Sequence, residues 1–229
     1  MKKKLQFSIG APVTLFIFIA SLVILILDEC VFKGKATQNI FSCPAAKGNA
    51  IFLFTVPLNY FRLILHPFGQ NGLPIFFADC ALLLSLGRQS EEIYGKPVLI
   101  IMAVFSSLVA GVLNASLGNC LMLGLSPLIF TLILLSLGGF KSNGTVYLPN
   151  LILLFLYLTF QVYLSLKSPA SYSEQDVGKI KDFFNHCLPA LISFAGGIAG
   201  SLFAFLSTKG KSSRKGRIRG NGDTTEVTL

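Results

Sequence analysis

The chain has 229 residues, of which 53% are hydrophobic and 13% charged, and its formal net charge is +9. Soluble domains carry about 25% charged residues, so this composition excludes an ordinary soluble globular domain. The basic residues cluster at 1–4 and 209–219, beside apolar runs, as is typical of the cytoplasmic flanks of membrane helices. We therefore expect the lipid bilayer as a partner and no nucleic acid.

The cysteine and histidine pattern predicts neither a metal site nor a cofactor. The five cysteines form no CxxC motif, and the chain holds only two histidines. A zinc site needs about four such ligands at characteristic spacings.

The first predicted element is a membrane span over residues 7–27, which carry no charge. About 20 apolar residues suffice to cross the hydrocarbon core. The lysines that precede this run predict a cytoplasmic N-terminus. A cleaved signal peptide is the alternative, but it would be shorter and would end in small residues, whereas this run ends in Asp28 and Glu29.

A long first loop, residues 28–72, follows the first span. Its apolar stretch Ala50 to Phe61 is too short for a span, so we expect it to lie in the membrane interface or to re-enter the membrane. With a cytoplasmic N-terminus this loop lies outside, where Cys30 and Cys43 could form a disulfide. The sequence leaves that pairing open.

Five further spans are predicted at residues 73–87, 97–114, 121–138, 149–166 and 187–207. The uncharged stretch 97–140 is twice too long for one span, and its Gly-, Asn- and Ser-rich centre at 114–119 is typical of a turn. The predicted organisation is therefore a basic cytoplasmic N-terminus (1–6), an all-α bundle of six transmembrane helices (7–207) and a basic cytoplasmic tail (208–229). Anionic lipid head groups are a further expected partner of that tail.

Three short strings occur in order along these spans. The first joins His66-Pro67-Phe68 to Gly87, Glu91 and Gly95 at the end of the second span. The second is GLSP at 124–127, and the third is FAGGIAG at 194–200. In order and spacing they resemble the strings of the rhomboid family of intramembrane serine proteases, over roughly residues 60–206. The resemblance implies a six-transmembrane-helix rhomboid-like bundle, in which Gly87, Glu91 and Gly95 are structural.

The resemblance also assigns the catalytic positions, and this chain departs from most of them. Ser126 matches the nucleophile, but Phe194 stands where the family has its histidine base and cannot take the serine proton. The oxyanion positions correspond to Ile75, which donates nothing, and to Asp79. We expect Asp79 to be a protonated, inward-facing polar anchor, because an apolar bundle disfavours the charged carboxylate.

The residues around this position are predicted to pack it. Phe130 and Phe194 are expected to pack together and to fill the space that the serine and histidine of the catalytic dyad occupy in the family. Ser126 and Pro127, after Gly124, also have the pattern of an N-cap and a first helical residue, so Ser126 is either a helix start or a nucleophile. The third string contains Gly196, Gly197 and Gly200. Small residues at this spacing on a membrane helix let a neighbouring helix approach closely.

These departures favour an inactive pseudoprotease that binds transmembrane segments of client proteins, with the bacterial plasma (inner) membrane as the expected location. The alternative is an active rhomboid serine endopeptidase with Ser126 as nucleophile and an unorthodox base. His66 and His186 are the candidates for that base, although both are expected to be interfacial polar residues. A transporter is a third alternative, but it would need more polar residues along the spans and internal repeats.

Overall fold

The computed structural model describes residues 10–47, 51–70, 72–137, 147–167 and 179–219, and the side chains of all of these except 167, 179–183 and 208–219. The predicted basic N-terminus and the basic part of the tail therefore lie outside the described side chains. The elements in chain order are α1 (Pro12–Leu27), η1 (Asp28–Phe32), α2 (Lys35–Asn39), α3 (Pro57–Leu65), η2 (His66–Phe68), α4 (Leu73–Tyr94), α5 (Lys96–Leu117), α6 (Ser126–Leu137), α7 (Leu148–Lys167) and α8 (Lys179–Arg219).

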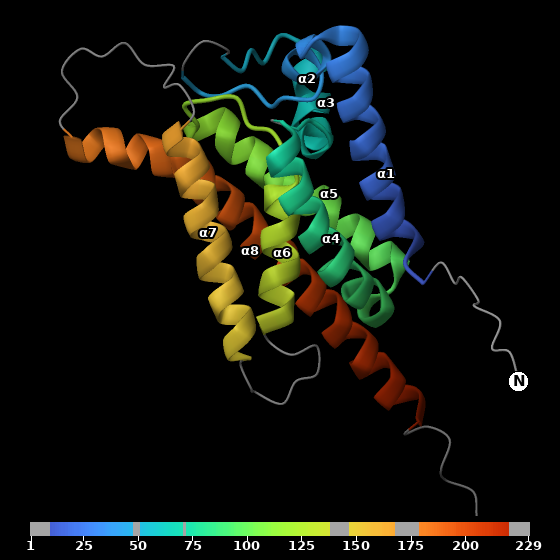
Figure 1. Cartoon of the computed structure of the whole chain (residues 1–229). Helices are drawn as coiled ribbons and strands as arrows, with labels where there is room; N and C mark the ends of the chain where they lie inside the picture. Colours follow the sequence, from blue (N-terminus) through green and yellow to red (C-terminus); the bar gives the residue numbers. More distant parts are fainter. Residues whose placement is uncertain (1–9, 48–50, 71, 138–146, 168–178, 220–229) are drawn as a thin grey trace, which may run out of the picture.

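The long helices α1 and α4–α8 run alternately up and down one bundle (Figure 1). The beginning of α1 and the end of α8 lie at the same end, and the segment from η1 to η2 lies at the other end. Each of these helices overlaps one predicted span, but several ends differ. Helix α1 begins at Pro12 instead of 7, α4 continues to Tyr94 instead of ending at 87, and α6 begins at Ser126 instead of 121. Helix α8 runs over Lys179–Arg219 instead of 187–207.

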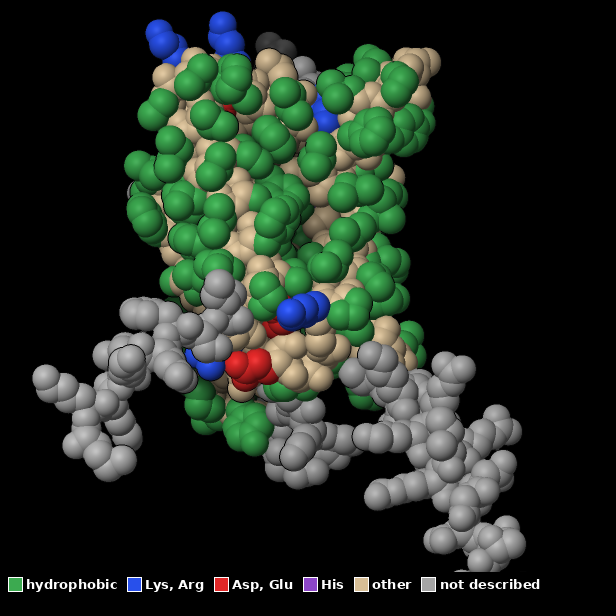
Figure 2. Space-filling view, turned by 90° about the vertical axis from the view of Figure 1, so that its right-hand side faces the viewer, with side chains coloured by type: hydrophobic (Ala, Val, Ile, Leu, Met, Phe, Trp, Pro, Cys, Tyr) green, Lys and Arg blue, Asp and Glu red, His purple; other side chains and the backbone are tan. Residues whose placement is uncertain are grey.

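Four helical stretches in the described part of the chain are long and apolar enough to cross a membrane: Pro12–Phe32, Lys96–Leu117, Leu148–Leu166 and Phe184–Ser207. Helix α4 is long but carries charges, and α6 is apolar but has 12 described residues. Apolar side chains cover the face of the bundle seen in Figure 2, and its charged side chains gather toward the two ends. The described chain is thus all-helical with several membrane-spanning candidates, which is consistent with a multi-pass membrane protein.

Helix α6 forms the centre of the bundle, since ten of its twelve residues are buried. It packs against α4, α5, α7 and α8. The glycines of α8 make the closest of these approaches, because a Cβ at Gly197 would overlap the Cβ of Phe130 and one at Gly200 would overlap the side chain of Thr131. Within a membrane, such close backbone packing is a main source of helix association.

The end of the bundle opposite the start of α1 is fixed by Asn114. Its amide Nδ2 donates to the carbonyls of Cys43, Pro44 and Cys120 at 3.1 to 3.3 Å. The disulfide that the sequence left open does not form: both thiols are free, since Cys43 is fully buried beneath this network while Cys30 is exposed on η1.

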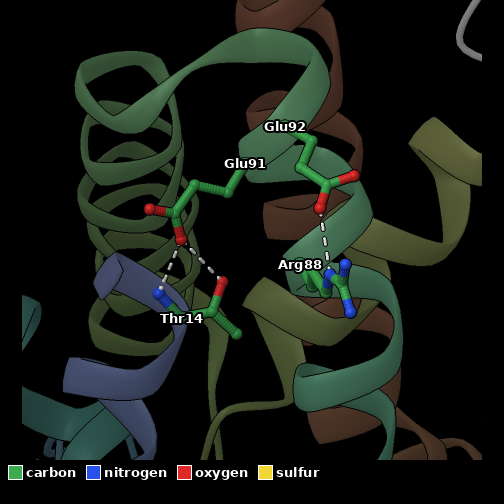
Figure 3. A network of polar contacts seen from close by, with 4 residues as sticks. All are labelled: Thr14, Arg88, Glu91 and Glu92. Atoms are coloured by element: carbon green, nitrogen blue, oxygen red, sulfur yellow. Dashed lines mark hydrogen bonds and ion pairs between the residues drawn. The ribbon is translucent and has the colours of Figure 1, made fainter. Parts of the chain in front are cut away.

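The other end is held by Glu91, a buried carboxylate near the end of α4 (Figure 3). Its oxygens accept hydrogen bonds from Val13 N (3.1 Å), Thr14 N (3.0 Å) and Thr14 Oγ1 (3.0 Å). Val13 N and Thr14 N belong to the first turn of α1, where the backbone N–H groups have no carbonyl acceptor within the helix. Glu91 thereby caps α1 and keeps the last turns of α4 helical beyond the predicted end at 87.

We predict that Glu91→Ala lowers the free energy of unfolding by about 1.5–3 kcal/mol, because it removes charge-assisted bonds and leaves buried N–H groups without partners. The measurement is reversible unfolding of the detergent-solubilised chain. Glu92→Ala is the matched control, since Glu92 makes only an exposed ion pair with Arg88 at 2.9 Å and such pairs contribute little. Equal losses from the two substitutions would contradict the capping role.

Candidate functional site

Four polar side chains from three helices meet in the interior of the bundle. The Tyr157 hydroxyl of α7 donates to Asp79 Oδ1 of α4 at 2.8 Å, and Gln161 Nε2 donates to the same hydroxyl at 2.8 Å. Ser126, at the start of α6, lies beside the same hydroxyl. Tyr157 is therefore the centre of this group, and it lies next to both the predicted nucleophile position and the predicted oxyanion position.

Burial makes this network costly to leave unpaired. Asp79 is fully buried, Tyr157 is 3% exposed and Ser126 is 6% exposed. In surroundings without water, polar groups of this kind are stable only when they are hydrogen bonded. Ile75 lies one helical turn before Asp79 on the same face of α4 and offers no hydrogen-bond donor.

Aromatic rings fill the space beside this network. The rings of Phe130 and Phe194 lie 5.4 Å apart and meet edge to face, so the predicted contact between them is present. The ring of Tyr157 lies 4.9 Å from that of Phe130, also edge to face. The position assigned to the base is thus part of an apolar cluster, which has no group that can accept a proton.

Gly124 brings the chain into the site with a backbone φ of 96°, a left-handed conformation that favours glycine. Three oxygen atoms surround it: a Cβ at Gly124 would lie 3.8 Å from Asp79 Oδ2, 3.9 Å from Gln70 Oε1 and 3.9 Å from Ser126 Oγ. Of these, Asp79 Oδ2 and Gln70 Oε1 are buried and have no hydrogen-bond partner within the described structure. The site therefore holds two unused acceptors around one glycine.

Ser126 is the first helical residue of α6 and not its N-cap, which is the position that the sequence pattern suggested. The first backbone bond of α6 runs from Ile129 N to Leu125 O at 3.0 Å, which puts Leu125 in the capping position. The Ser126 hydroxyl is turned toward Gly124 and Tyr157, so it faces the site although Leu125 caps the helix.

His66 reaches the site by its backbone, since Gly124 N donates to His66 O at 3.2 Å. Its side chain is fully buried instead of interfacial, with Nδ1 3.0 Å from Leu63 O and Nε2 without a hydrogen-bond partner in the described structure. Burial lowers the pKa of His66 to about 4, so the ring is neutral at physiological pH. His186 lies eight residues before Phe194 on α8, which is roughly 12 Å of helical rise. A base must approach its hydroxyl to about 3 Å.

Three members of the site were not predicted from the sequence: Tyr157, Gln161 and Gln70. Tyr157 and Gln161 are polar residues spaced four apart in an apolar helix, which is a signal for one shared face. Nothing in the pattern shows which neighbouring helix that face meets. Among the described residues there is also no group of His, Cys, Asp or Glu that could hold a metal ion.

No protein-family model matches the chain, and no curated protein matches it at a significant level. The class of protein therefore follows from the fold alone. It is an all-helical chain with four helices apolar enough to span a membrane and a buried polar network between α4, α6 and α7.

We predict that Tyr157→Phe lowers the free energy of unfolding by about 1–3 kcal/mol, since it keeps the ring but leaves Asp79 and Gln161 without their shared partner. Tyr147→Phe, at an exposed tyrosine just before α7, is the control and should have little effect. A double-mutant cycle with Asp79→Asn should show non-additive losses. Additive losses would show that the two residues are not coupled.

Proposed function

We propose that the chain is a rhomboid-like, six-span membrane protein without protease activity, which binds transmembrane segments of client proteins. One observation carries the absence of catalysis: Phe194 stands at the position of the base, and its ring packs edge to face against Phe130 at 5.4 Å. A serine hydroxyl without a base is a poor nucleophile.

The alternation of the six long helices supports the proposed number of spans (Figure 1). Helix α4 has 22 residues, about 33 Å of rise, which is enough to cross the hydrocarbon core. Helix α6 is shorter, but it is buried among its neighbours and so does not need to match the lipid thickness itself. An even number of spans places both termini on one side, and the basic flanks favour the cytoplasm.

The seam between α4 and α7 is the proposed client site. Helix α7 lies at the edge of the bundle, and Tyr157 is its one buried residue in the described part. Its bond to Asp79 is the hydrogen bond that the structure shows between α7 and α4. Separation of the two helices at this bond would expose Asp79 and Ser126 to a segment in the membrane.

The unused acceptors indicate which segments would bind. Asp79 Oδ2 and Gln70 Oε1 both face Gly124, and neither has a hydrogen-bond partner in the described structure. Hydroxyl, amide or unpaired backbone N–H groups of a client helix would supply a donor in surroundings without water. We therefore infer that the clients carry a polar residue or a helix break in their membrane span.

A fluorophosphonate probe tests the absence of catalysis. We predict no labelling of wild type above the level of Ser126→Ala, because no base activates the hydroxyl. Phe194→His alone should remain inactive, since Ile75 and Asp79 do not provide the oxyanion donors. Labelling of wild type that disappears in Ser126→Ala would overturn the proposal in favour of an active endopeptidase.

A photo-crosslinker placed at Ile75 tests the client site, because Ile75 shares the helical face of Asp79 and is partly exposed. We predict crosslinks to transmembrane peptides of other proteins, identified by sequencing of the crosslinked peptide. The same crosslinker at Ile101, an exposed residue of α5, is the matched control. Equal capture of the same peptides at both positions, or capture of lipid alone at Ile75, would contradict a client site at this seam.

A further inference from the structure

A groove lies between α1 and α5, on the side of the bundle away from α7. Figure 2 looks onto this side and shows a hollow between apolar side chains, with a basic side chain near its lower end. The groove has a volume of about 540 Å³, and all of its lining residues except Lys96 and Ser107 are apolar. It is separate from the polar site, and its occupant does not depend on the proposed function.

The groove is elongated and apolar. Along α5 its lining runs from Lys96 to Ser107, which is about 16 Å at 1.5 Å per residue. An extended hydrocarbon chain matches both this elongated form and the apolar lining.

The charges at one end of the groove favour an anion. Lys96 is exposed, and it is the first residue of the 22-residue helix α5, whose N-terminus adds partial positive charge. The nearby carboxylates are already engaged, Glu91 by the start of α1 and Glu92 by Arg88. No ion pair to Lys96 occurs among the described side chains.

We propose that this groove binds one acyl chain of an anionic glycerophospholipid, with its phosphate at Lys96 and its chain extending toward Ser107. Phe16 and Ile17 of α1 and Ala103 and Val104 of α5 form the walls along the chain. The apolar walls hold the chain in place, and the ammonium group selects the charge of the head group.

Native mass spectrometry of the full chain tests this proposal, with an equimolar mixture of phosphatidylglycerol and phosphatidylcholine that have the same acyl chains. Wild type should retain one lipid, with preference for phosphatidylglycerol. Val104→Trp fills the groove and should reduce retention about tenfold. Lys96→Gln leaves the packing unchanged and should reduce the preference for phosphatidylglycerol about fivefold.

Two matched controls separate the groove from the general lipid surface. Ile101→Trp adds the same side chain at an exposed α5 position outside the groove and should retain the lipid. Lys35→Gln removes an exposed charge at the other end of the bundle and should keep the preference. The proposal is overturned if wild type retains no lipid, if Ile101→Trp loses as much as Val104→Trp, or if Lys96→Gln keeps the full preference. A dimer that Val104→Trp dissociates would assign the groove to a second copy and would also overturn it.

Discussion

The close approach of α8 to α6 and α5 positions the rest of the bundle. Gly197 lies against the backbone of Phe130, and Gly196 lies against Ala110 and the carbonyl of Ser106. In a bilayer no hydrophobic driving force brings apolar helix surfaces together, because the lipid tails are as apolar as the side chains. Helices therefore associate mainly through short-range dispersion contacts and hydrogen bonds. Because α8 contacts two helices at glycines, it fixes α5 and α6 together, and α6 then carries Ser126 into the interior.

Polar groups complete what close packing begins. Three buried polar side chains join parts of the chain that are distant in sequence: Glu91 joins α4 to α1, Asn114 joins α5 to the first loop, and Tyr157 joins α7 to α4. Such bonds are specific in direction, whereas contacts between apolar faces are not. The bundle therefore has a defined arrangement, although the face seen in Figure 2 is largely apolar.

The positions of the long helices were predictable because charges and turn residues interrupt the apolar runs. The predicted end of the second span at 87 was wrong. The charged residues after it are typical of a loop, but one of them, Glu91, is buried against α1. The sequence also left open whether Cys43 pairs with Cys30, and the structure resolves this by burying Cys43 against the distant residues Asn114 and Met122. Local sequence contains no information about such partners.

At the site, the resemblance brought Ser126, Phe130, Phe194 and Asp79 together. The structure bonds Asp79 to Tyr157, places Ser126 beside that tyrosine and packs Phe130 against Phe194. The tyrosine itself was missed, because the pattern of α7 shows a polar face but not its neighbour, which only three-dimensional packing decides.

Asp79 is the residue whose presence needs a reason beyond the fold. An aspartate deep in a membrane helix costs about 2.5–3.5 kcal/mol on insertion scales. A single interhelical hydrogen bond in a membrane contributes about 0.6 kcal/mol and at most about 1.7. The bond to Tyr157 therefore does not offset the cost, and the second oxygen, Oδ2, has no partner in the described structure. Without a base at Phe194 the carboxyl serves no acyl transfer, so under the proposed function the remaining stabilisation comes from the donor of a bound segment. That segment would be held most tightly where its own polar group would otherwise face lipid.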